Sequence, residues 1–259
     1  MCDRIGALVR SLQPNAAAFN GGGVSDSPVR WCGTEGGIPV PTGGPVWSTA
    51  DCGWCPDGSG TGSPPNVSDS WYPSGVDVTL QQGDRWFYMP GVAVHPITDL
   101  VQFYHHSVGM NGHLEIDFAI DRTGRVDPVH AKAYAQFGAW IASCYGSPLA
   151  VGGLPFGATS FVVALPAAAS IDRVLLQEDQ SKGQLIVSYV VEAQVNGAWQ
   201  PFSSGVTVGA KRIDIAAAPV TATALRVSVT EAFATPTALT ASIFAPEPCA
   251  TSPFEYPLV

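Results

Sequence analysis

The stretch from Val29 to Thr49, VRWCGTEGGIPVPTGGPVWST, limits the fold more than any other part of the chain. Its glycines and prolines exclude a regular helix or a central strand, because proline lacks a backbone donor and glycine weakens both elements. Within it lie Trp31, Trp47 and a single carboxylate, Glu35. Aromatic faces stack on sugar rings and a carboxylic acid can protonate a leaving oxygen, so this loop can form a sugar-cleaving site. On spacing alone, a solvated glutamate is the commoner interpretation.

Composition indicates a folded chain without long helices. Of 259 residues, 46% are hydrophobic and 13% charged, which is far from the disordered class, and 28 glycines with 22 prolines favour loops and β structure. The net charge is -9 and the 12 lysines and arginines form no cluster, so nucleic acid is not an expected partner. Apolar runs are too short for a membrane span, so no membrane partner is expected either.

Hydrophobic periodicity predicts alternating helices and strands up to about residue 148. The opening residues carry apolar positions at helical spacing and predict an amphipathic helix inside a fold rather than a signal peptide. Asp127 and Pro128 form an N-cap and a first helical position. The predicted helices are 3–13, 97–108 and 129–143, and the predicted strands are 16–20, 76–80 and 113–120.

Two motifs resemble metal or redox sites, but the sequence favours ordinary interpretations. Cys52 and Cys55 have CxxC spacing, yet no second ligand pair accompanies them and no helix follows, so a local disulfide or two loop thiols is favoured over zinc or redox chemistry. His105 and His106 are neighbours on a predicted helix and point about 100° apart, so they do not easily ligate one metal. A pair at a helix end near solvent is the expectation. The six cysteines are compatible with some disulfides.

After about residue 150 the pattern changes to short apolar β runs. A small-residue run, Ser147–Gly157, predicts a domain boundary, and Asn196-Gly197 is a strong hairpin signal. Strands with regular turns suggest an antiparallel β-sandwich. The expected strands are 160–164, 170–177, 186–196, 211–215, 224–230 and 241–244, with 206–208 as one more.

Five colinear segments resemble the α-L-fucosidases of glycoside hydrolase family 29, especially the plant-type branch. Residues 8–37 are similar to the family's RELQP…RWxGxExG run, and Val46–Thr49 is similar to its CWST. Val76–Tyr88 is similar to its CDVSIRPGWFYH, and Tyr104–Gly124 to its YYxSVGRNxxLLLNxPPDxxG. The runs VLLQEDQSKGQLIVSYVVEA and VTVGAKRI resemble its C-terminal galactose-binding-like sandwich.

The resemblance implies a fold of two parts and a retaining hydrolase of terminal α-L-fucosyl groups. The expected fold is α/β plus all-β: the C-terminal half of a (β/α)8-like barrel over residues 1–148, a galactose-binding-like antiparallel β-sandwich over 152–246, and a tail over 247–259. Glu35 matches the acid/base, and Trp31 and Trp47 match aromatic positions beside it. Trp86 and Phe87 match a further aromatic segment and are expected to bind substrate. No cofactor or metal is expected.

Several departures from the family pattern bear on catalysis. Gly75, Met89 and Asp117 stand where the family has Glu, His and Asn. The family's aspartate nucleophile precedes the acid/base by more residues than this chain has before Glu35, and Asp26 has no strand-end context that would make it a substitute. The chain is therefore expected to be incomplete.

Function, partner and location follow from the resemblance, with one alternative open. The expected partner is a fucosylated glycan, and the expected location is extracellular or lysosomal/vacuolar. The alternative is a non-catalytic carbohydrate-binding protein or an inactive fucosidase fragment. The sequence predicts no particular oligomer.

Overall fold

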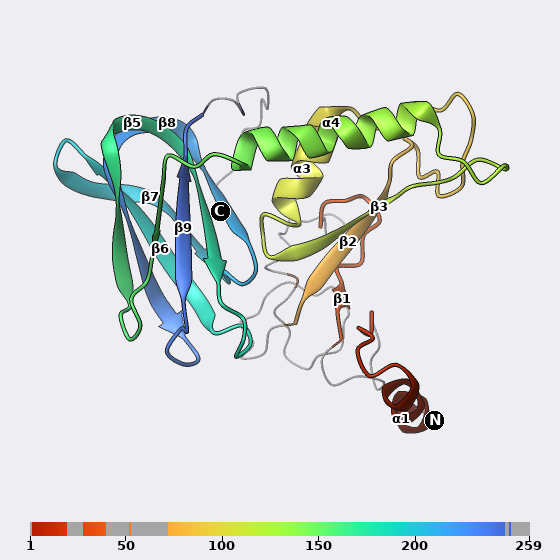
Figure 1. Ribbon diagram of the computed structural model, residues 1–259, viewed down its shortest axis with the longest axis horizontal. Coiled ribbons are helices and arrows are strands. Elements are labelled where there is room, and N and C mark those ends of the chain that lie inside the picture. The colour runs from red at the N-terminus through yellow and green to blue at the C-terminus, as the bar shows by residue number, and fades with distance from the viewer. Residues whose placement is uncertain (1, 20–27, 40–51, 53–71, 247–248, 250–259) are drawn as a thin grey trace.

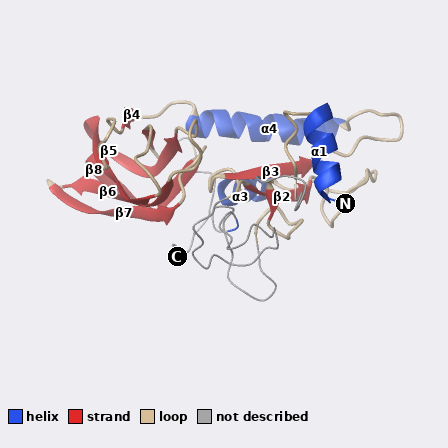
Figure 2. Cartoon of the chain, turned by 90° about the horizontal axis from the view of Figure 1, so that it is seen from below, coloured by secondary structure: helices blue, strands red, loops and turns tan. Residues whose placement is uncertain are grey.

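The computed structural model describes residues 2–19, 28–39, 52, 72–246 and 249, and its elements form an α/β part followed by a sheet-rich part (Figure 1). Strands predominate, and helices are few (Figure 2). None of the helices in the described ranges has the length and hydropathy needed to cross a membrane. The α/β part comprises α1 (Cys2–Leu12), β1 (Arg30–Trp31), β2 (Ser74–Thr79), α3 (Ile97–His106), β3 (Gly112–Asp117) and α4 (Pro128–Tyr145).

The first sheet is parallel, with the strand order β1-β2-β3. An isolated parallel bridge, Phe19 to Val29, lies just before β1. Val78 of β2 and Ile116 of β3 point to one face, where they pack with residues of α3 and α4 such as Leu100 and Phe137. Side chains alternate across a strand, so the residues between them face the other side of the sheet. One face of this sheet is therefore covered by helices, and the polar positions lie on the other.

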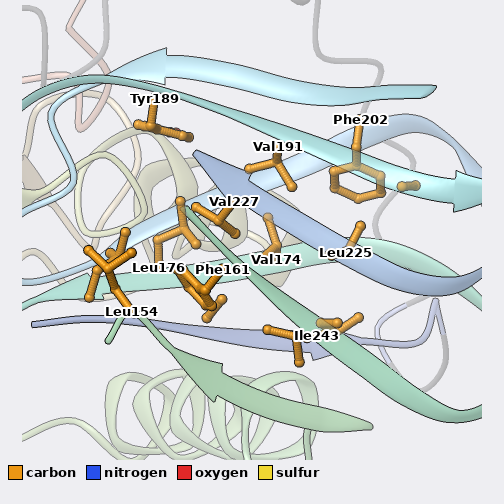
Figure 3. Packing of buried hydrophobic residues seen from close by; sticks show 14 of the residues in the cluster. Leu154, Phe161, Val174, Leu176, Tyr189, Val191, Phe202, Leu225, Val227 and Ile243 are labelled. Carbon is orange, nitrogen blue, oxygen red and sulfur yellow. The ribbon is translucent and has the colours of Figure 1, made fainter. Parts of the chain in front are cut away.

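The sheet-rich part is one antiparallel sheet of six strands, in the order β4-β9-β5-β8-β6-β7. Register shifts interrupt the pairing of the long strands β5 and β8, between Ala164 and Ala169 and again after Ile171. Residues from both halves of β5, such as Phe161 and Leu176, join one buried cluster, so the sheet curls around its own core (Figure 3). The strands are β4 (Ala150–Gly153), β5 (Ser160–Glu178), β6 (Ile186–Val195), β7 (Ala198–Val206), β8 (Arg212–Ala232) and β9 (Leu239–Phe244).

The two parts share buried contacts. Leu175, Ile213 and Phe244 of the antiparallel sheet belong to the same hydrophobic cluster as the residues of α3 and α4. A disulfide joins Cys144 at the end of α4 to Cys249. Burial of apolar surface on both sides of this contact fixes the sheet-rich part against the helices that cover the parallel sheet.

Most predicted elements are present, with bounds that differ by a few residues. The helices over 3–13, 97–108 and 129–143 are confirmed as α1, α3 and α4. The Asp127 side chain accepts a hydrogen bond from the Val129 backbone N–H, as expected of an N-cap. Asn196 and Gly197 both have positive φ angles, 51° and 81°, and form the turn between β6 and β7. Such angles are those of the two-residue hairpin turn that Asn-Gly predicts.

Other element predictions were wrong. Of the strand expected over 16–20, the described residues 16–19 form only the bridge at Phe19. Residues 118–120 lie beyond the end of β3. Segments 160–164 and 170–177 are one strand, β5, and segments 211–215 and 224–230 are one strand, β8, because pairing continues across their irregular centres. The extra strand expected at 206–208 is instead β7, which ends at Val206. β4 lies inside the run 147–157 where the domain boundary was placed, so that boundary stays a prediction.

Candidate active site

The face of the parallel sheet opposite the helices carries a row of polar side chains. Strand register places Trp31 beside Gly75, Asp77 beside Glu115, and Thr79 beside Asp117. Because residues two apart on a strand share a face, all of these positions lie on one side together with His113. A Cβ added at Gly75 would lie 3.1 Å from the Cβ of His113, which agrees with that assignment. Three carboxylates, an imidazole and an indole can therefore meet a ligand from the same side.

Trp31 is fixed to this face by a hydrogen bond. Its indole Nε1–H donates to Oδ1 of Asp77 over 2.8 Å, and both groups are partly buried. The two residues are 46 positions apart in the chain. Since the indole is a donor only, the carboxylate sets which way the ring turns.

The loop that carries Glu35 is bound to β2 at both ends. The backbone N–H of Cys32 donates to the carbonyl of Gly75 over 2.9 Å, and that of Gly37 donates to the carbonyl of Asp77 over 3.0 Å. Gly37 has φ +72°, and a Cβ there would lie 2.7 Å from the Phe103 ring, so only glycine fits. The Glu35 side chain is exposed, at the tip of this short loop.

Asp117 is the most perturbed carboxyl of the polar face. Burial raises its pKa, and the neighbouring Glu115 adds to the rise, while His130 opposes it. Its Oδ2 is buried without a hydrogen-bond partner in the described structure, and so is Nδ1 of His130. The pKa of Tyr134 is raised to about 12 by burial and by Asp117. A carboxyl with a raised pKa at a strand end is suited to hold or exchange a proton.

The predicted site residues are brought together only in part. Trp31 and Glu35 lie in and beside the same anchored loop, whereas Trp47 lies outside the described residues. Trp86 is half-buried and Phe87 is 88% exposed, in the loop after β2. Within the described ranges, neither of these two makes a hydrogen bond or ring contact with Trp31 or Glu35, so their role in binding remains a prediction.

The prediction that the histidine pair lies near solvent was wrong for His105. That side chain is 4% exposed and packs against Trp140 and Tyr145, with Nε2 2.5 Å from the Tyr145 hydroxyl. Burial lowers the pKa of His105 to about 3, with Arg173 and His106 adding to the effect. The contacts come from α4, which the local sequence of α3 could not reveal.

Sequence reasoning did not assign the polar face as a unit. Asp77 and Glu115 alternate with the apolar residues Val76, Val78, Leu114 and Ile116, and that alternation was the available signal. No cluster of three or more His, Cys, Asp or Glu side chains that could hold a metal occurs in the part of the chain that is described.

Comparison with known proteins finds relatives both by sequence and by structure. No family model matches the chain. It is 25% identical over 252 residues to "Putative alpha-L-fucosidase 1" of Oryza sativa subsp. japonica, covering 82% of this chain and 47% of that protein. It is 23% identical over 251 residues to "Alpha-L-fucosidase 1" of Arabidopsis thaliana, covering 80% and 47%. The chain thus spans about half the length of the curated relatives it matches.

Solved structures give the same result. A "putative alpha-L-fucosidase" from Bacteroides thetaiotaomicron superposes with a TM-score of 0.77 at 28% identity, covering 92% of this chain and 55% of that one. A Ruminococcus gnavus GH29 fucosidase in complex with fucose shares the fold, with a TM-score of 0.65 at 20% identity over 84% of this chain and 50% of that one. The plant relatives agree with the plant-type sequence segments. The chain is therefore a partial, about half-length relative of the α-L-fucosidases of glycoside hydrolase family 29.

Proposed function

We propose that this chain supplies the acid/base half of a retaining α-L-fucosidase, with Glu35 as the proton donor and acceptor. The observation that carries the proposal is the anchored loop at the end of β1, which holds Glu35 and is fixed to β2 at Cys32 and Gly37. Active sites of β/α barrels lie in the loops at the carboxyl ends of the strands. Glu35 lies in the loop that follows the carboxyl end of β1.

The same reasoning extends to the fold. Three parallel strands follow one another in space as they do in sequence, with α3 between β2 and β3 and with α4 after β3. This is the repeating unit of a (β/α)8 barrel, so residues 1–148 are proposed as its C-terminal half. The polar face would then line the barrel and the helices would cover its outside. The curled antiparallel sheet over 152–246 is proposed as the galactose-binding-like sandwich, followed by a tail over 247–259.

An exposed apolar stripe on α1 supports the half-barrel proposal. Ile5, Leu8, Val9 and Leu12 lie at helical spacing, and they are 37% to 72% exposed. A barrel helix normally buries such a stripe against strands and neighbouring helices. The part of the relatives that this chain does not cover would supply those neighbours.

Retention requires a second carboxylate. A retaining glycosidase places its nucleophile and its acid/base about 5–5.5 Å apart, and no residue near the start of this chain matches the family's nucleophile motif. We place the nucleophile in the part of the relatives that this chain does not span. Asp26, the weak alternative, lies outside the described residues.

The substrate is proposed to be a fucosylated glycan, held by the faces of Trp31, Trp47, Trp86 and Phe87. The Cys144–Cys249 disulfide supports an extracellular or lysosomal/vacuolar site of action, because disulfides persist in oxidising compartments. The alternative is a carbohydrate-binding protein without turnover. What favours it is the half-length match, which leaves one carboxylate of the pair unassigned.

A hydrolysis assay with two leaving groups tests the proposal. Wild-type protein, Glu35→Gln and the control Glu231→Gln, an exposed glutamate of β8, are each completed with the half of a relative that this chain does not span, which supplies the proposed nucleophile. The three proteins are assayed on aryl α-L-fucosides with good and poor leaving groups. Loss of an acid catalyst typically lowers the rate of hydrolysis by a factor of about 10²–10⁴, and the loss should be largest with the poor leaving group. Unchanged turnover in Glu35→Gln would refute the role of Glu35. Glycan binding without turnover in the wild type would favour the binding protein.

A further inference from the structure

Two buried cysteines, one directly after β1 and one further along the chain, lie side by side. Cys32 directly follows β1 and is 5% exposed, and Cys52 is 0% exposed. With Val76 they form one buried cluster, and their thiols are within hydrogen-bonding contact of each other. Both are reduced in the structure. Two thiols in contact inside a small apolar cluster have little freedom to adopt other partners.

We propose that Cys32 and Cys52 form a disulfide that closes the segment between them into a ring. The ring contains Glu35 and Trp47, so the bond would fasten both ends of the segment proposed to carry the acid/base. Only this last consequence depends on the proposed function. The pairing itself differs from the one that CxxC spacing suggests, which would join Cys52 to Cys55.

The chemistry balances with a disulfide of the glutathione type as the oxidant. One cysteine loses a proton to water, and its thiolate attacks the oxidant, which releases one glutathione thiol and leaves a mixed disulfide. The second cysteine thiolate then attacks the protein-bound sulfur and releases a second glutathione. In total, two electrons and two protons pass from the cysteine pair to the oxidant, which becomes two glutathione thiols, and one protein S–S bond forms.

Burial decides when the bond can form and how long it lasts. The pKa of Cys32 is raised, first by burial and then by Cys52, and a buried thiol is a poor nucleophile. The bond should therefore form during folding, before the pair is covered, and should resist reductants afterwards. Cys144 and Cys249 are already joined, so a compartment that oxidises them would oxidise the second pair as well.

Peptide mapping of the whole chain tests the pairing directly. Protein made in an oxidising compartment is unfolded in denaturant, alkylated without reduction and cut after Arg30 and Glu35 and before Asp51 and Asp57. We expect residues 31–35, which hold Cys32, to be linked to residues 51–56, which hold Cys52 and Cys55. Alkylated Cys32 in the denatured, unreduced protein, or a closed Cys52–Cys55 pair, would overturn the proposal.

Stability measurements with a matched control separate Cys52 from Cys55. The bond would close a ring between positions 20 apart, so Cys32→Ser and Cys52→Ser should each lower Tm by about 5–10 °C without reductant. The Tm of the double variant should fall no further than that of either single variant, because both substitutions remove the same bond. Cys55→Ser is the control and should keep the wild-type Tm. A lower Tm in Cys55→Ser together with an unchanged Tm in Cys32→Ser would refute the pairing. Neither outcome depends on fucosidase activity.

Discussion

Removing the Asp77 carboxylate should release Trp31 from the polar face of the parallel sheet. The Asp77→Ala substitution deletes the acceptor of the 2.8 Å indole hydrogen bond, but the backbone bond from Gly37 to the Asp77 carbonyl remains. A hydrogen bond to a charged group contributes about 1.5–3 kcal/mol, and partial burial places this one near the lower end. We expect a loss of about 1–2 kcal/mol in the free energy of unfolding. For a chain of this size that is about 2–8 °C in Tm.

The Asp77→Asn variant separates hydrogen bonding from charge. Its side-chain oxygen can still accept from the indole, and it no longer faces the like charge of Glu115 on β3. Opposed like charges on neighbouring strands destabilise a sheet by about 0.2–1 kcal/mol, so relief of that repulsion offsets the weaker acceptor. Asp77→Asn should therefore remain close to the wild type. Glu115→Gln is the matched control, because it removes the same repulsion and leaves the indole bond in place.

Two measurements decide the outcome. Thermal unfolding gives the stability loss, and the indole N–H resonance of Trp31 in a ¹⁵N-labelled sample reports the hydrogen bond itself. We expect the resonance to shift in Asp77→Ala and to stay near its wild-type position in Asp77→Asn. The reasoning is refuted if Asp77→Ala leaves both the resonance and the Tm unchanged, or if Asp77→Asn is as damaging as Asp77→Ala.

Two further predictions concern helix capping and pH. Asp127→Ala removes the acceptor for the Val129 N–H and for the Tyr88 hydroxyl, and should lower the free energy of unfolding in urea by about 1–2 kcal/mol. Asp127→Ser can still cap the helix and should recover most of that loss. Equal losses in the two variants would contradict the capping role. Burial lowers the pKa of His105 to about 3 and that of His106 to about 4, so below pH 6.5 the unfolded chain binds protons that the native chain does not. The free energy of unfolding should be highest above pH 6.5 and should fall towards pH 4 by about 1.4 kcal/mol per pH unit for each histidine. The fall should be shallower in His106→Gln. Equal slopes in wild type and His106→Gln would contradict this prediction.

Local sequence signals predicted most of the elements but not always their extent. Asp127-Pro128 begins α4 where capping chemistry predicts, and Asn196-Gly197 makes the turn between β6 and β7. These signals are reliable because cap and turn act within a few residues. The continuity of β5 was missed, since its centre is irregular and only its partners β8 and β9 hold it together. The resemblance by sequence segments already indicated a fucosidase-like chain, and the comparisons agree.

What the sequence by itself determined is the Glu35 loop, because its glycines and its flanking Trp31 lie within a few residues of Glu35. The tertiary structure alone decided what surrounds that loop. The bond from Trp31 to Asp77, the burial of His105 under α4, and the contact between Cys32 and Cys52 each join residues far apart in the chain. Parallel strands cannot be joined by a short turn, so their register and the polar face they share arise only when the whole α/β part assembles.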